Sequence, residues 1–283
     1  MFRFNKHLIV IGSARSGTSW ISELLAQRFR YRMLFEPEQE FKTTHGHLVC
    51  DKYITSKKEA SEAYKYLKQV FANRVNSDWI AQNSNRKYKM HLWPFLPKKY
   101  IIKFVRANLA ARFMNEIYKI PVLFIIRNPY DVLHSQQRVK FPWLYNLSYF
   151  QKQSELVKLI KTHYDFDLTK TDRFSSLQIL TIRWCIENAI PLVVQNEFPN
   201  KFRLIKYEAL RNDIELFREL CDYFNLKPVD NLEEHYKKPS SKTHPKSAIR
   251  NKEAVVEKWK KEELAEINEI LEIFKMTQYP LQN

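Results

Sequence analysis

The 283-residue sequence contains only three glycines, where average usage of about 7% would place roughly twenty. A chain that avoids glycine keeps it where the backbone must turn tightly or let another group come close. Two of the three, Gly12 and Gly17, lie within one six-residue stretch. We therefore expect that stretch to be an open turn that faces a ligand.

Cysteine and long apolar runs are also scarce. Cys50, Cys185 and Cys221 are odd in number and widely spaced, which fits neither a disulfide framework nor a CxxC metal site. No apolar run approaches the roughly eighteen residues of a membrane span, and the residues before the first predicted strand are too few and too polar for a signal peptide. These features predict a soluble protein in a reducing compartment, which we expect to be the cytoplasm.

Acidic residues are outnumbered, with 31 Asp and Glu against 47 Lys and Arg, for a net charge of +16. Such an excess favours a polyanionic partner: a phosphorylated cofactor, an acidic glycan, nucleic acid or an anionic membrane surface contacted peripherally. An ordinary solvated basic surface explains about half of it. The 45% hydrophobic and 14% aromatic content indicates a folded globule. No repeat or linker divides the chain, so we expect one domain over residues 1–283.

Residues 8–20 predict a strand, a loop and a helix. The four branched apolar residues 8–11 precede a turn signal, and apolar residues then recur at helical spacing from Trp20. In such a corner, backbone N–H groups and the positive end of the helix converge on phosphate oxygens. An ordinary strand–turn–helix corner is the alternative, since two spaced glycines alone are weak evidence.

The loop departs from the Walker A motif of P-loop nucleotide-binding proteins. Gly12 and Gly17 have its spacing, but Thr18 and Ser19 stand where Lys and Ser or Thr are required. Arg15 lies inside the loop and supplies a permanent cation beside the predicted phosphate site.

A second strand is predicted at residues 31–35, followed by Glu36 and Pro37. Proline disfavours helix in the preceding residue, so we expect Glu36 to be extended. Ligands of open parallel sheets bind outside the carboxyl ends of the strands, which places Glu36 near the glycine loop. A surface carboxylate that closes a turn is the alternative, and Glu38 and Glu40 are weaker candidates from the same segment.

The clearest strand is predicted at residues 122–126, followed by Arg127. Asn128 as cap and Pro129 as first helical residue specify the next helix. A P-loop NTPase commonly places a Mg²⁺-binding Asp at the end of such a strand. Arginine there suits direct recognition of a phosphate and not of a metal.

The remaining chain predicts further strands and helices around a central parallel sheet, in a three-layer α/β fold. The strands are expected at 100–106 and 202–207, and the helices at 57–75, 108–118, 151–163, 174–197, 208–224 and 255–274. The pair His45 and His47 favours a loop over a metal site, because no third ligand lies nearby in the sequence. His91 is a candidate base, although a structural histidine is the commoner role.

Three of these stretches together resemble the PAPS-dependent sulfotransferases, whose donor is 3′-phosphoadenosine 5′-phosphosulfate. Residues 14–20, Ala-Arg-Ser-Gly-Thr-Ser-Trp, resemble the family's 5′-phosphosulfate loop. Residues 124–135, with an Arg and a Ser eight positions apart, resemble its 3′-phosphate motif. Residues 206–210, Lys-Tyr-Glu-Ala-Leu, are similar to its tyrosine-containing segment after a late strand. The resemblance spans most of residues 7–275 and implies the family's P-loop NTPase-like fold.

The resemblance also implies roles for individual residues. The 5′-phosphosulfate would be held by Arg15, Ser16, Gly17, Thr18 and Ser19, the 3′-phosphate by Arg127 and Ser135, and the adenine side by Trp20 and Tyr207. Lys89-Met-His91 echoes the base segment of the phenol enzymes. Residues 34–37 and Lys103-x-x-Arg106 are closer to the carbohydrate and bacterial branches. Arg250 stands where the family's C-terminal Arg-Lys-Gly loop would lie, although no glycine accompanies it.

The implied reaction moves a sulfuryl group from PAPS to a hydroxyl or amine of an acceptor, leaves 3′-phosphoadenosine 5′-phosphate (PAP), and needs no metal. We expect Arg15 to stabilise the leaving phosphate and Glu36 to act as base, with His91 as second candidate. Lys103 and Arg106 would position the sulfuryl group or the acceptor, for which the resemblance favours a glycan or glycolipid over nucleic acid. A polyanion-binding module without catalysis and a P-loop kinase are the alternatives.

Overall fold

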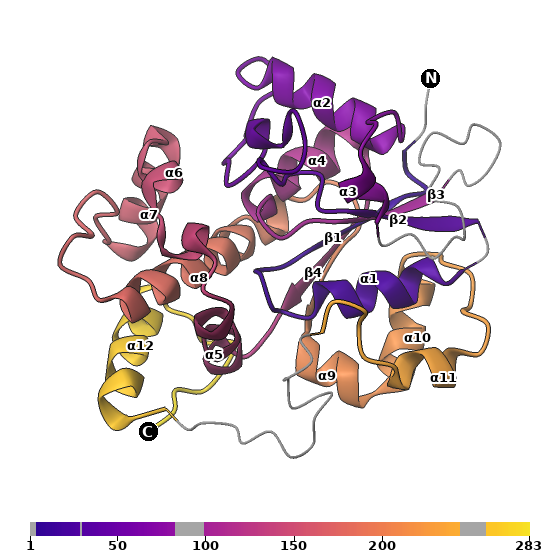
Figure 1. Cartoon of the computed structure of the whole chain (residues 1–283). Coiled ribbons are helices and arrows are strands. Elements are labelled where there is room, and N and C mark those ends of the chain that lie inside the picture. The colour runs from indigo at the N-terminus through magenta and orange to yellow at the C-terminus, as the bar shows by residue number, and fades with distance from the viewer. Residues whose placement is uncertain (1–3, 29, 83–98, 244–258) are drawn as a thin grey trace.

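The computed structural model describes residues 4–28, 30–82, 99–243 and 259–283. A five-stranded, entirely parallel sheet forms its centre, in the order β2-β3-β1-β4-β5 (Figure 1). The strands are β1 (Leu8–Ile11), β2 (Tyr31–Phe35), β3 (Lys99–Lys103), β4 (Val122–Ile126) and β5 (Phe202–Lys206). All five predicted strands are confirmed, and so is the single α/β domain with a central parallel sheet.

The central strands form because their residues are apolar on both faces. β1 lies between β3 and β4, and its Ile9 is in register with Ile102 on one side and Val122 on the other. Every residue of β1, β2 and β4 is buried. A parallel strand covered by helices on both faces requires such a continuous apolar run, so the sequence pattern could predict these strands.

Helices cover both faces of the sheet (Figure 1). One face packs against α2 (Ser61–Phe71) and α4 (Ala111–Tyr118) through one apolar cluster. The other packs against α1 (Thr18–Ala26), α10 (Ile214–Tyr223) and α11 (Leu232–Lys237) through another. The short helices α3 (Asp78–Ala81) and α9 (Tyr207–Asn212) complete these layers.

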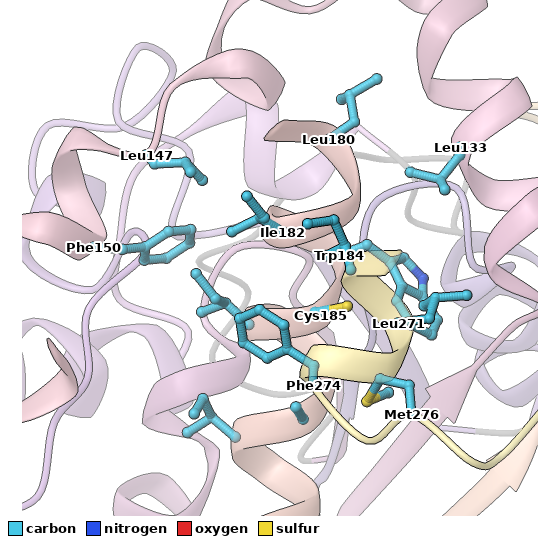
Figure 2. Packing of buried hydrophobic residues seen from close by; sticks show 14 of the residues in the cluster. Leu133, Leu147, Phe150, Leu180, Ile182, Trp184, Cys185, Leu271, Phe274 and Met276 are labelled. Carbon is cyan, nitrogen blue, oxygen red and sulfur yellow. The ribbon is translucent and has the colours of Figure 1, made fainter. Parts of the chain in front are cut away.

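A further group of helices lies beside the sheet, at the left of Figure 1. It comprises α5 (Pro129–Val139), α6 (Ser148–Gln151), α7 (Ser154–Tyr164), α8 (Ser176–Val193) and α12 (Lys261–Ile273). Figure 2 shows its core, where Trp184 and Cys185 of α8 pack with Leu271, Phe274 and Met276 from the C-terminal segment. Single-turn 3₁₀ helices lie at Gly46–Leu48, Asn108–Ala110, Pro142–Tyr145 and Gln195–Glu197.

The observed helices differ from the predicted ranges at their ends, and the ranges 108–118 and 151–163 each include parts of two helices. Two further differences concern residues 213 and 36. The helix expected at 208–224 is divided into α9 and α10, because the Asp213 side chain leaves the helix and accepts the N–H groups of Glu215 and Leu216 as an N-cap. Glu36 is not extended: its φ is +43°, and the chain turns sharply there while its N–H still donates to the carbonyl of Lys103. In the described part of the chain, no helix has both the length and the apolar character needed to span a membrane.

A buried charge network ties residues 40–51 to the helices beside the sheet. The Asp51 carboxylate accepts from Arg106 of the segment after β3 and, over 2.6 Å, from Arg183 of α8. Arg183 Nε also lies 2.8 Å from Glu187 Oε1. The guanidinium groups of Arg106 and Arg183 both lie within 5 Å of the Trp143 ring centre. The two arginines hold the pKa of Asp51 below its usual range, against the opposing effect of burial.

We predict that Asp51→Asn lowers the free energy of unfolding by about 3–5 kcal/mol, because it leaves two buried guanidinium groups without their carboxylate. Chemical denaturation at neutral pH measures the loss. The matched control is Asp165→Asn, whose ion pair with Lys161 is exposed and whose removal should have no measurable effect. Equal stability of the two variants would contradict the network's role.

Candidate active site

The polar residues singled out in the sequence meet at the carboxyl edge of the sheet. Glu36 follows β2, Lys103 ends β3, the 12–17 loop follows β1, Arg127 follows β4 and Tyr207 follows β5. Neighbouring strands are about 4.8 Å apart, so the sheet order lines these groups up along one rim. Glu36 and Lys103 lie at one end, and Arg127 and Tyr207 lie at the other, with the glycine loop between them.

Gly12 and Gly17 are required by close contacts within this loop. A Cβ on Gly12 would lie 2.4 Å from the Ile125 carbonyl oxygen, and one on Gly17 would lie 2.3 Å from two carbons of the Tyr207 ring. Gly17 also has φ of +90° and precedes α1 without any side-chain cap. The first turn of α1 therefore presents its N–H groups and the positive end of its dipole to the rim.

The hydroxyl side chains of the loop differ in where they lie. Ser16 is buried and donates through Oγ to the Ser13 carbonyl over 2.6 Å, which closes the loop on itself. Thr18 is buried at the start of α1, whereas Ser19 is half-buried in the same turn. The Ser13 hydroxyl is fully buried and has no hydrogen-bond partner within the described residues.

Arginines gather at the end of the rim formed by β1 and β4. Arg127 donates from Nη1 to the carbonyl oxygen of Arg15 over 3.1 Å, and Arg15 donates from Nε to Ser135 Oγ over 2.9 Å. Burial lowers the pKa of Arg15, and the charges of Arg127 and Arg138 lower it further. The repulsion among these three cations favours an anion beside them, because the single carboxylate of Asp131 offsets only part of their charge.

The sequence reading did not include Arg138. It lies three residues after Ser135 on α5, so both side chains share one helix face. The three-residue spacing between Ser135 and Arg138 was the sequence signal that could have identified Arg138 as part of the site. Within the described chain, Arg127 forms an ion pair with one carboxylate only, that of the half-exposed Asp131, whose Oδ2 lies 3.5 Å from Arg127 Nη2.

Tyr207 forms the wall of the rim beyond the loop. Its ring lies on the Gly17 backbone, with the Arg127 guanidinium 4.8 Å from the ring centre. Trp20 meets the same ring edge-on at 5.9 Å but is buried, with Arg211 over its own ring at 4.8 Å. Tyr207 is therefore the accessible aromatic surface of this pair, and Trp20 supports it from below.

Glu36 and Lys103 form a buried ion pair at the other end of the rim. Glu36 Oε1 accepts from Lys103 Nζ, and Oε2 accepts from the Gln39 side chain over 3.0 Å. The indole N–H of Trp79 donates to the Glu36 carbonyl over 3.2 Å, which holds the left-handed turn. The Lys103 ammonium also lies 4.5 Å from the centre of the Phe35 ring.

The other two carboxylates of this segment face the interior. Glu38 is fully buried, and its Oε1 accepts the backbone N–H groups of Val105 and Arg106 over 2.7 and 3.0 Å, while Oε2 has no hydrogen-bond partner among described residues. Glu40 accepts from Arg106 over 3.0 Å and from Tyr149 over 2.8 Å. Arg106 is 1% exposed and fully engaged, so in this structure it positions neighbouring residues and does not face an acceptor.

Several sequence candidates fall elsewhere. His91 and Arg250 lie outside the described residues. His45 and His47 have ring centres 6.4 Å apart, and no group of three His, Cys, Asp or Glu side chains within the described ranges could hold a metal ion.

The fold and the rim together define an α/β protein with a glycine loop of the phosphate-binding type at the carboxyl edge of its sheet. Its glycine loop lies between a parallel strand and a helix N-terminus, as in phosphate-binding sites generally, with arginine in place of the usual lysine. The family model described as "Sulfotransferase domain" matches residues 5–275. The chain therefore belongs to the sulfotransferase family. A search of the curated proteins finds no match.

Solved structures of similar extent are sulfotransferases too. A sulfotransferase domain from the curacin biosynthetic pathway matches at TM-score 0.49 and 16% identity, over 97% of this chain and 98% of that one. A sulfotransferase from Alicyclobacillus acidocaldarius matches at TM-score 0.45 and 11% identity, over 95% of this chain and 94% of that one. Mouse SULT7A1 complexed with PAP matches at TM-score 0.42 and 11% identity, over 97% of this chain and 86% of that one. The family assignment rests on the sequence model, because all three TM-scores are below 0.5.

We predict a pH dependence of stability from Glu38. Burial and the charge of Glu36 raise its pKa from 4.5 to about 7. Between these pH values the unfolded chain has lost a proton that the folded chain keeps, so the free energy of unfolding falls as pH rises, by about 3 kcal/mol at most for one such group. Glu187, whose pKa burial also raises to about 7, adds a similar decline.

Glu38→Gln should therefore make the decline measured by urea denaturation between pH 5 and pH 8 smaller by about 2–3 kcal/mol. Glu62→Gln on the exposed face of α2 is the control and should leave the decline unchanged. An unaltered slope in Glu38→Gln would show that this carboxyl group titrates normally.

Proposed function

We propose that the protein is a PAPS-dependent sulfotransferase that transfers a sulfuryl group to a hydroxyl or amine of an acceptor, with a carbohydrate or glycolipid as the acceptor class. The observation that carries this proposal is the contact of Arg15 with both Arg127 and Ser135 beside the uncapped start of α1, where Arg138 adds to the positive charge. Within a family of sulfotransferases, that arrangement fits a nucleotide with phosphates at both ends.

The residues present fit such a nucleotide. No side chain caps the start of α1 at Gly17, and the N–H groups there would meet the 5′-phosphosulfate together with Arg15. Arg127 and Ser135 would meet the 3′-phosphate, since both already contact Arg15 from the β4 side. Tyr207, half-buried beside the loop, would form part of the adenine side. When bound, PAPS supplies the sulfuryl group and leaves as PAP.

The protein's part in the reaction divides between the two ends of the rim. Glu36 takes the proton from the acceptor hydroxyl after exchanging its Gln39 hydrogen bond for the acceptor. Lys103 loses its anionic partner as Glu36 becomes protonated, and can then donate to oxygens that gain charge. Arg15 and the loop N–H groups stabilise the phosphate that departs. PAPS would supply the sulfuryl group to the acceptor oxygen, and Arg15 with the loop N–H groups would hold the phosphate of the PAP that remains.

The acceptor class is supported by the family branch that residues 34–37 and 103–106 resemble, and by exposed aromatic rings. Phe141 is 44% exposed and stacks on Trp143, which contacts Arg106. Phe41 is 77% exposed and follows Glu40, the carboxylate bound to the same Arg106. Such rings can carry the apolar face of a sugar or a lipid-linked acceptor.

We predict that PAP binds the wild-type chain without Mg²⁺, and that Arg15→Ala and Arg127→Ala each weaken binding by about 10- to 100-fold. Loss of a charge-assisted hydrogen bond costs about 1.5–3 kcal/mol. Titration calorimetry with and without Mg²⁺ makes the measurement. The control is Arg112→Ala, an arginine paired with Glu116 away from the rim. Undiminished PAP binding in both variants would instead favour a polyanion-binding module, and Mg²⁺-dependent ATP turnover a kinase.

We predict that Glu36→Gln keeps PAP affinity within about twofold but lowers turnover by about 10²–10⁴-fold, the usual contribution of a general base. Turnover is measured as PAP release from PAPS with the acceptor that gives most product in a panel of monosaccharides, glycolipids and 2-naphthol. Gln39→Ala, which removes the neighbouring hydrogen bond but not the carboxylate, is the control and should retain most activity. Wild-type turnover in Glu36→Gln would remove Glu36 from the role.

A further inference from the structure

A cavity lies at the amino edge of the sheet, opposite the rim. Its volume is about 390 Å³, within the range of small-molecule sites. Lys6 before β1, Lys99 at the start of β3, Lys119 before β4 and Lys201 before β5 all line it. Strands of four or five residues rise about 3.3 Å per residue, so this cavity and the rim are roughly 15 Å apart, and one small ligand cannot occupy both.

The lysines around this cavity lack negative partners. No Asp or Glu lines it, and none of the four makes an ion pair with a carboxylate in the described part of the chain. Elsewhere in the described chain, Lys103, Lys161, Lys170 and Lys238 do form ion pairs with carboxylates. Lys201 donates to the Tyr223 carbonyl over 2.6 Å, which directs its ammonium but does not neutralise it.

The pKa values agree with an excess of positive charge. Burial lowers the pKa of Lys99, and Lys227, Lys6 and Arg30 lower it further by repulsion. The buried His7 in the cavity wall donates to the Phe71 carbonyl and accepts from the Tyr100 N–H. Burial lowers its pKa to about 4, so it adds no charge at neutral pH.

The cavity lining fits oxyanions. Side-chain amides of Asn5 and Asn225 stand among the lysines and can donate to the same oxygens, whereas the Asn200 amide in the same lining already donates to the Asn115 carbonyl over 2.8 Å. Lysine binds phosphate and sulfate as a point charge, and several lysines around one hollow favour a ligand with more than one anionic group. We propose that this cavity binds a small polyanion with two or more phosphate or sulfate groups, at a site separate from the rim. The inference does not depend on the proposed catalytic function.

Inorganic tripolyphosphate is the probe, titrated into the full chain by calorimetry at low ionic strength. The double variant Lys99→Gln/Lys119→Gln should weaken its binding about tenfold or more, because two charges at contact distance are lost. Lys65→Gln/Lys68→Gln removes the same charge from the exposed face of α2 and should change binding less than about twofold. Equal losses in the two double variants would overturn the proposal.

Two further arms separate the sites and the sources. In the Arg15→Ala chain the lysine-dependent binding must remain, and its disappearance would assign tripolyphosphate to the rim and refute the cavity site. Phosphatidylcholine vesicles with and without phosphatidylinositol bisphosphate distinguish a lipid headgroup from a free polyanion. If vesicles with the bisphosphate lipid bind the wild-type chain and do not bind Lys99→Gln/Lys119→Gln, the ligand of the cavity is the lipid headgroup. Lys6→Gln/Lys201→Gln repeats the measurement with two other cavity lysines, and full affinity in both cavity variants would also refute the site.

Discussion

The ring of Tyr207 lies on the backbone of Gly17 where no Cβ could fit, and much of the rim depends on that contact. The Arg127 guanidinium covers the same ring and donates to the carbonyl oxygen of Arg15. The carboxyl ends of β1, β4 and β5 are thereby joined through one aromatic ring and one guanidinium. Glycine is kept at residue 17 because a Cβ there would lie 2.3 Å from two carbons of the Tyr207 ring, and the ring would have to move.

The positive charge of the chain is used in two different ways. Arg106 and Arg183 are buried and neutralised by Asp51, so they hold segments together and are not offered to ligands. Arg15 has a hydroxyl and two other arginines nearby, which leaves positive charge at the rim for a substrate. Arginines that are buried against a carboxylate therefore have a structural role, whereas those without such a partner face a ligand. The sequence alone does not distinguish the two groups.

Much of the fold could be predicted from local patterns. Continuous apolar runs identified the central strands, and Asn128 with Pro129 specified the start of α5. Prediction was wrong where a distant contact prevailed over a local preference: Glu36 takes a left-handed conformation held by Lys103 and Trp79. The candidate site was predictable as a set of residues, but its internal partners were not.

The sequence alone determined the strand–loop–helix corner, the arginine in place of the Walker lysine, and the family, because these depend on residues within a few positions of one another. Only the tertiary structure decided that Glu36 pairs with Lys103, 67 residues away, and that Asp51 takes Arg183, 132 residues away. It also decided that Arg106 is buried and that four lysines surround one hollow at the opposite edge. Such pairings follow from the order of strands in the sheet, which no local spacing encodes.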